Sequence, residues 1–91
     1  MKNTKTLQIL CSARIPENRI NIHPNEGADI GLMMTKCSAQ TASGAPVDVY
    51  LLNECPKESV EISSRLWERI GKPAKVILRY DDGRLEIDPA R

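Results

Sequence analysis

The chain has 91 residues, a hydrophobic fraction of 41% and a net charge of +1, from 13 basic and 12 acidic side chains. This length predicts one domain, since compact domains commonly have about 100–150 residues. The near-neutral charge excludes the strongly basic composition of non-specific nucleic-acid binders, whose affinity comes mainly from phosphate contacts. With no Phe, one Trp and two Tyr, the core must be mostly aliphatic, and burial in a homodimer would stabilise so small a domain.

The three cysteines indicate a reducing compartment. Cys11, Cys37 and Cys55 form an odd set without C-x-x-C spacing, which argues against a secreted disulfide framework. The apolar run near the N-terminus is broken by Gln8 and is too short for a signal peptide. No stretch approaches the ~20 apolar residues that a membrane span needs. We therefore expect a cytoplasmic protein that does not cross a membrane.

The sequence of the first half predicts short strands separated by polar loops and turns. Alternating apolar residues indicate strands at residues 6–13 and 20–22, separated by a loop at residues 14–19. Residues 24–27 (PNEG) have the composition of a turn. A further strand, ambiguous with a short helix, is expected at residues 29–37. The small polar segment at residues 38–46 is expected to be mobile, and no internal repeat is apparent.

The second half predicts a strand, a second short strand, a helix and a hairpin. The strands are expected at residues 47–52 and around Val60 and Ile62. Two turns of helix follow over residues 63–70, with Ser63 or Ser64 as the N-cap and Gly71 after the C-terminus. Pro73 prevents the helix from continuing.

The last twelve residues, YDDGRLEIDPAR, predict a hairpin of defined register. Asp82-Gly83 is the favoured pair for a two-residue turn. The register then pairs Tyr80 with Leu85 and Leu78 with Ile87 on one face, and Arg79 with Glu86 and Asp81 with Arg84 on the other. A slip of one residue would pair apolar with charged positions. Pro89 is expected to end the return strand.

These elements predict a single, mostly β domain over residues 1–91 with one short helix, either a β-barrel or a swapped-hairpin-like α+β fold. Residues 1–46 form a β-rich N-terminal half. Residues 47–91 form a strand-strand-helix-hairpin half.

From residue 60 to residue 91 the order of elements resembles the AbrB/MazE swapped-hairpin family of bacterial regulators and antitoxins. The residues that match its pattern are Val60, Ile62, Leu66, Ile70, Gly71, Val76, Leu78, Asp82, Gly83, Arg84, Leu85, Ile87 and Pro89. The resemblance implies that two chains interlock their hairpins and bind DNA through basic residues before and within the helix. Carried onto this chain, it implies nucleic-acid contacts by Lys57, Arg65 and Arg69. In a swapped dimer, Trp67, Tyr80 and Leu85 would lie at the interface.

Other residues weigh against nucleic acid or against catalysis. Glu61 stands where a DNA-facing residue of the family is often basic or neutral, and a carboxylate there would repel phosphate. The alternative interpretation of the basic residues is a solvated helix face.

The three cysteines and His23 are scattered singly over the predicted elements, so no metal site or other cofactor is expected. Cys55 could be an exposed thiol, but nothing beside it suggests a nucleophile, and we expect no enzyme.

Two functions remain open at this point. The first is a homodimeric AbrB/MazE-like DNA-binding regulator or antitoxin. The second is a protein-only accessory or inhibitor module from a phage or mobile element, which binds no nucleic acid. The pattern of elements favours the first, and the balance of charges favours the second.

Overall fold

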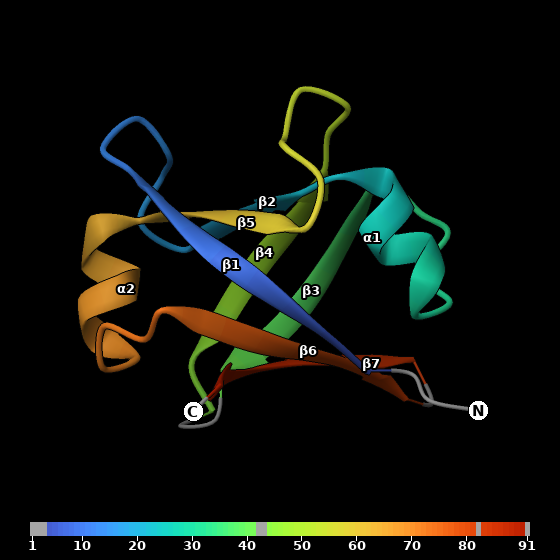
Figure 1. Ribbon diagram of the computed structural model, residues 1–91. Helices are drawn as coiled ribbons and strands as arrows, with labels where there is room; N and C mark the ends of the chain where they lie inside the picture. The colour runs from blue at the N-terminus through green and yellow to red at the C-terminus, as the bar shows by residue number, and fades with distance from the viewer. Residues whose placement is uncertain (1–3, 42–43, 82, 91) are drawn as a thin grey trace.

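The computed structural model describes residues 4–41, 44–81 and 83–90. It is a closed barrel in which the strands follow the order β1-β5-β2-β4-β3-β7-β6, with a short helix at each side (Figure 1). In chain order the elements are β1 (Thr4–Ser12), β2 (Arg19–Ile22), α1 (Pro24–Asp29), β3 (Lys36–Thr41), β4 (Pro46–Leu51), β5 (Ser59–Ser63), α2 (Ser64–Arg69), β6 (Lys75–Asp81) and β7 (Arg84–Ala90). The prediction of a mostly β single domain is confirmed, with a barrel as its form and a second helix that was not predicted.

The barrel interior is aliphatic, as the composition predicts. In β4, β6 and β7, buried residues alternate with more exposed ones, which is the pattern of a barrel wall. The buried core consists of Leu7, Ile20, Ile22, Ile30, Leu32, Ala39, Val47, Val49, Leu51, Val60, Ile62, Leu66, Val76, Leu78, Leu85 and Ile87. Trp67 packs against the edge of this core and is half-buried.

The C-terminal hairpin has the predicted register. β6 and β7 pair Tyr80 with Leu85, Leu78 with Ile87, Arg79 with Glu86, and Asp81 with Arg84. Leu78, Leu85 and Ile87 are buried, so the apolar face of the hairpin is the inward one. Of the predicted turn pair, Asp82 lies outside the described residues, and Gly83 has a φ of 79°. Pro89 does not end the return strand, since β7 continues to Ala90 with Pro89 opposite Val76.

The chain contains a structural repeat, contrary to the sequence-based expectation. A first unit (β1, β2, α1, β3) and a second unit (β4, β5, α2, β6) have the same order of elements. Positions 40 residues apart correspond in the two parallel ladders: β1 pairs Gln8 with Ser59, while β4 pairs Asp48 with Arg19. The helices obey the same relation, from Pro24 to Asp29 and from Ser64 to Arg69. β7 is an additional strand that lies between β6 and β3.

The two units are interleaved rather than packed side by side. Among the first six strands, every ladder joins one unit to the other: β1 with β5 and β6, β2 with β4 and β5, and β3 with β4. Within the described residues no two strands of the same unit pair. Neither unit can therefore form a sheet without its counterpart.

Three segments of the first half differ from the prediction. Residues 24–27 were predicted as a turn but begin α1, which His23 caps by accepting a hydrogen bond from Asn25 N at its Nδ1 (3.0 Å). The strand predicted at residues 29–37 begins only at Lys36. The segment predicted to be mobile contributes its first residues to β3 and its last to β4.

α1 forms although Glu26 and Gly27 interrupt its apolar face, because residues of other segments complete its packing. Gly27 stands where α2 has Trp67, and a Cβ at Gly27 would lie 2.4 Å from Leu51 Cδ2. Leu51 and Leu32, both buried, occupy this space instead. The α1–β3 connection is longer by three residues than the α2–β6 connection, since Ala39 opposite Val47 corresponds to Val76 opposite Leu7. This longer connection carries Met33 and Met34, which are 81% and 44% exposed.

Interleaving predicts that the halves fold only together. We expect residues 1–45 and residues 46–91, produced separately, each to lack native structure, because each would expose its strands without partners. Mixed in equal amounts, they should recover the amide NMR spectrum of the intact chain. A native-like, protected spectrum from either fragment alone would contradict this reading of the fold.

Candidate interaction face

A row of outward-facing residues crosses five strands on one side of the barrel. Leu10 of β1 is the register partner of Glu61 of β5, which pairs with Asn21 of β2, then Tyr50 of β4 and Lys36 of β3. Glu61, Asn21 and Tyr50 each lie between buried neighbours on their own strands, and Leu10 and Lys36 are exposed, so the row follows the outer side of the barrel wall, although Asn21 is only 7% exposed. Two loops, residues 13–18 and residues 53–58, rise at either end of the β2–β5 pair (Figure 1). We call the row and these two loops the upper face.

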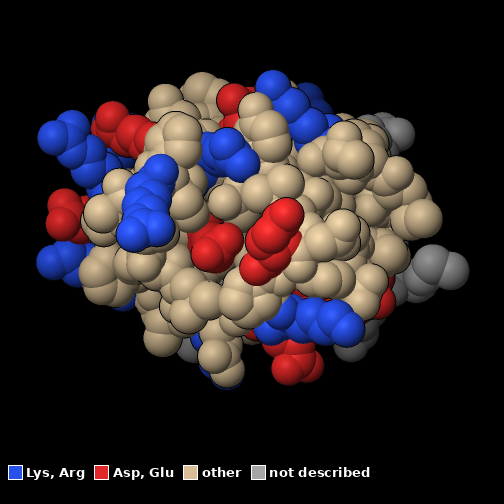
Figure 2. All heavy atoms as spheres, turned by 90° about the horizontal axis from the view of Figure 1, so that it is seen from above, with Lys and Arg blue, Asp and Glu red and all other residues tan. Residues whose placement is uncertain are grey.

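Opposite charges are mixed on the upper face. Figure 2, which looks down on it, shows acidic side chains near the middle and basic and acidic ones interspersed around them. Half-buried Tyr50 is flanked by two cations: the Arg19 guanidinium lies 3.9 Å from the ring centroid, and Lys36 Nζ lies 5.2 Å from it. Arg19 Nε also donates to Asn21 Oδ1 at 2.9 Å. These cation–π contacts hold two positive charges beside Tyr50, at one end of the row.

The loop at residues 13–18 is attached to α2. Ser63 Oγ donates to the backbone oxygen of Glu17 at 3.0 Å and accepts from Leu66 N at 3.1 Å, so the predicted N-cap also anchors a loop. The Glu17 carboxylate contacts Arg69 Nη2 at 2.6 Å and Arg65 Nη1 at 3.9 Å. These groups are substantially exposed, so the ion pairs orient the loop more than they stabilise the fold.

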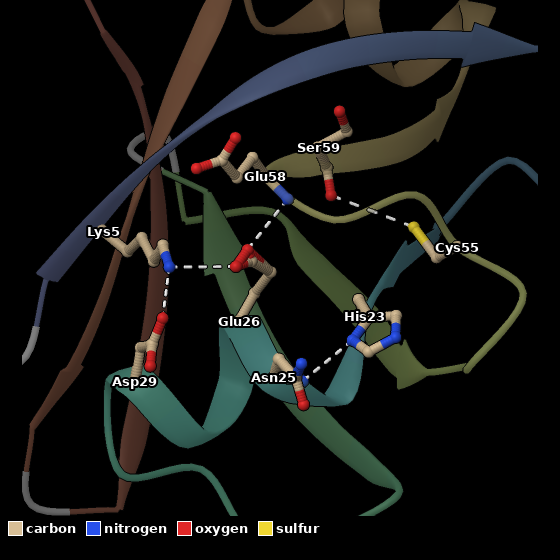
Figure 3. A network of polar contacts seen from close by, with 8 residues as sticks. All are labelled: Lys5, His23, Asn25, Glu26, Asp29, Cys55, Glu58 and Ser59. Carbon is tan, nitrogen blue, oxygen red and sulfur yellow. Dashed lines mark hydrogen bonds and ion pairs between the residues drawn. The ribbon is translucent and has the colours of Figure 1, made fainter.

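The loop at residues 53–58 is attached to α1 through Glu26. The Glu26 side chain accepts from Glu58 N at 2.9 Å, and its other oxygen lies 2.9 Å from Lys5 Nζ (Figure 3). Lys5 also pairs with Asp29, and hydrogen bonds to Asp29 and Glu26 raise the pKa of Lys5. Glu26 is 3% exposed and stands where α2 has the core residue Leu66. A buried carboxylate therefore links β1, α1 and this loop.

Cys55 lies beneath the same loop. It is 2% exposed, and its thiol contacts the backbone oxygens of Asn21 (3.4 Å) and Ser59 (3.8 Å). Burial, with the nearby Glu61 carboxylate, raises the pKa of Cys55 from 9.0 to about 12. The expectation of an exposed thiol is wrong for this residue: the exposed one is Cys11.

The three predicted nucleic-acid residues do not come together. Arg65 and Arg69 lie on α2, and both face Glu17. Lys57 lies by α1, at the other end of the upper face, where it lines a hollow with Asn25, Glu26, Ala28, Asp29 and Glu58. The surroundings of all three are thus partly acidic.

The predicted interface residues are placed on or in the barrel. Leu85 is 2% exposed and belongs to the core, and Tyr80 is half-buried against it. Trp67 donates from Nε1 to the backbone oxygen of Pro73 at 2.8 Å, and Lys72 Nζ lies 6.0 Å from its ring centroid. The residues that face outward on the upper face, Leu10 and Tyr50, were not predicted. Their strand alternation was a usable signal, but the sequence does not reveal which strands are neighbours.

Neither a metal-binding cluster nor a membrane-spanning helix is found in the part of the chain that the structure describes. No three histidine, cysteine or acidic side chains within it are grouped to hold a metal ion. No helix there is long and apolar enough to cross a membrane. Comparison with family models, with curated proteins and with solved structures found no match.

Removal of the Glu26 carboxylate should destabilise the fold. Glu26→Ala leaves Lys5 and the Glu58 amide without their partner, and breaking a buried ion pair typically costs about 3–5 kcal/mol. Urea denaturation would measure the free energy of unfolding. Asp29→Asn is the matched control, since the Asp29 side chain is 56% exposed, and it should cost less than about 1 kcal/mol. Equal losses for the two variants would contradict the linking role of Glu26.

Cys55 should remain a protonated, unreactive thiol in the folded protein. With Ellman's reagent at pH 8, we expect Cys11 to react first and Cys55 only on unfolding, because Cys55 is buried and its pKa is about 12. Above pH 9 the unfolded state loses this proton while the folded state keeps it. Stability should therefore fall as pH rises from 9 towards 12, by at most about 1.4 kcal/mol per pH unit. Cys55→Ala should flatten this slope, and an unchanged slope would contradict the assignment.

Proposed function

We propose that this chain is a small, non-enzymatic protein-binding module that contacts a protein partner through its upper face. The observation that carries the proposal is Glu61 in the outer row, where its cross-strand neighbours are Leu10 and Asn21. A carboxylate within this face opposes phosphate but suits a protein surface, where charged, polar and apolar groups are mixed. The partner, rather than a substrate, would supply the complementary groups.

The attachment of both loops supports this proposal. Ser63 and Glu26 anchor one loop each, so the ends of the face are held before any partner arrives. A preorganised surface loses less conformational entropy on association. The exposed apolar and aromatic groups of the row, Leu10 and Tyr50, are residue types that contribute well to protein interfaces.

One observation favours DNA binding as a second candidate function. The strand–helix–hairpin order on which the resemblance to AbrB/MazE regulators and antitoxins rests occurs twice in the chain, in β2-α1-β3-β4 and in β5-α2-β6-β7. One chain thus supplies the two units that the resemblance assigns to two chains. The barrel closes without a second copy, so homodimer formation stays a prediction that the fold does not require.

Capture experiments on surface variants test the protein-binding proposal. In lysate of the native organism treated with nuclease, the wild type should retain a partner that Leu10→Arg/Tyr50→Ala loses, since these changes alter the row. Arg79→Ala/Glu86→Ala is the matched control, because this ion pair lies on the β6–β7 hairpin away from the upper face. It should retain the partner.

The wild type and these two double variants also distinguish protein binding from DNA binding. Capture that disappears with nuclease, or that all three proteins share, would contradict the protein-binding proposal. Gel shifts over a salt series would then favour DNA binding if the wild type shows salt-sensitive binding that Lys57→Ala/Arg65→Ala/Arg69→Ala weakens.

A further inference from the structure

We infer that the partner places a single arginine or lysine side chain on Glu61, with its aliphatic stem against Leu10. This inference rests on the proposed function, because it names the chemistry of the partner at the upper face. It commits to a protein ligand with one basic side chain, rather than to a polybasic tail or a nucleic acid.

Glu61 is a half-buried carboxylate without a cationic neighbour. Its cross-strand neighbours are Leu10 and Asn21, and among residues 4–41, 44–81 and 83–90 no lysine or arginine lies within ion-pair distance of it. Arg19, on the adjacent strand β2, is already bound to Asn21 and stacked on Tyr50. The negative charge of Glu61 is therefore left for an external group.

The other glutamates are in a different position. Glu17, Glu26 and Glu86 each contact a lysine or arginine. Glu54, Glu58 and Glu68 form no such pair in the described structure, but all three are exposed to water. Glu61 combines partial burial with the absence of a cation. A charge that is partly desolvated gains more from an incoming ion pair than a solvated one.

The surroundings of Glu61 fit the rest of a basic side chain. Leu10, on the adjacent strand β1, is 40% exposed, and arginine and lysine readily lay their apolar stems on such a surface. Cys55, near Glu61 on the same side of the wall, is buried with a thiol whose pKa is about 12, so it remains uncharged. The thiol is close enough to hydrogen-bond the Glu61 carboxylate, but as a neutral group it leaves the negative charge uncompensated.

The far end of the row restricts the ligand to one positive charge. Arg19 and Lys36 both lie against Tyr50, so a second cation that continued along the row would meet two like charges. Like charges placed close together at an interface weaken binding and select against the wrong partner. The face therefore favours an isolated basic residue flanked by neutral or apolar ones.

Titration of the full-length protein with a blocked dipeptide tests the inference. The probe is N-acetyl-leucyl-arginine amide, and its control is the citrulline analogue, which has nearly the same shape but no charge. We expect saturable shifts of the Leu10, Asn21 and Glu61 amide resonances, with at least ~5-fold weaker binding of the citrulline peptide. Glu61→Gln should remove the preference for arginine. Glu54→Gln, which neutralises an exposed glutamate of the loop at residues 53–58, should keep it.

Several results would overturn the inference. They are equal binding of the two peptides by the wild type, an arginine preference that survives Glu61→Gln, shifts that cluster away from these amides, or no saturable shift at all. The capture experiment separates this outcome from the proposed function, since it tests the upper face with the partner itself and does not depend on the arginine peptide. If capture depends on the upper face while the arginine peptide fails, only the assignment of the basic side chain is wrong.

Discussion

The fold depends on strand pairing between the two units. Among the first six strands, every ladder joins one unit to the other, and β7 bridges both by pairing with β3 and β6. The aliphatic core is enclosed only when these ladders form together. The same interleaving carries the two loops to opposite ends of the β2–β5 pair, where each contacts the helix of the other unit. The upper face is a direct product of this topology.

The two units share a backbone plan but differ in chemistry at corresponding positions. Glu26 corresponds to Leu66, Gly27 to Trp67, and Asn21 to Glu61. A surface with true two-fold symmetry would offer a partner two equivalent orientations. Here one end of the row is acidic beside Leu10, and the other is basic around Tyr50. This difference in charge between the two ends of the row selects one orientation of the partner. The sequence divergence of the two units therefore sets both the composition of the upper face and the orientation in which a partner binds.

The sequence predicted those features that depend on neighbouring residues. The alternation around Asp82-Gly83 was sufficient for the register of β6 and β7, and Ser63 with Gly71 marked the bounds of α2. α1 was missed because Glu26 and Gly27 interrupt its apolar face, and the residues that complete its packing, Leu32 and Leu51, lie beyond the helix. Its helical structure comes from tertiary contacts, which propensity does not describe.

The candidate face could not be predicted for a related reason. The pairing of Glu17 with Arg69 joins residues far apart in the chain, and so it neutralises charges that looked free in the sequence. The repeat was missed because few identities survive beside Pro16 and Pro56 or Gly31 and Gly71. What the units share is the spacing of buried positions, as in Ile20 with Ile22 and Val60 with Ile62. That spacing is common to many unrelated strands.

Interleaving of the two units also has a consequence for folding during synthesis on the ribosome. When the first unit emerges, its strands have apolar inner faces but none of the partners with which they pair in the finished barrel. Those partners are complete only once β7, which pairs with β3 and ends at Ala90, has left the exit tunnel. Many small domains can begin folding from their N-terminal part, but this chain must wait, and its nascent strands stay open to aggregation or chaperone binding during that interval.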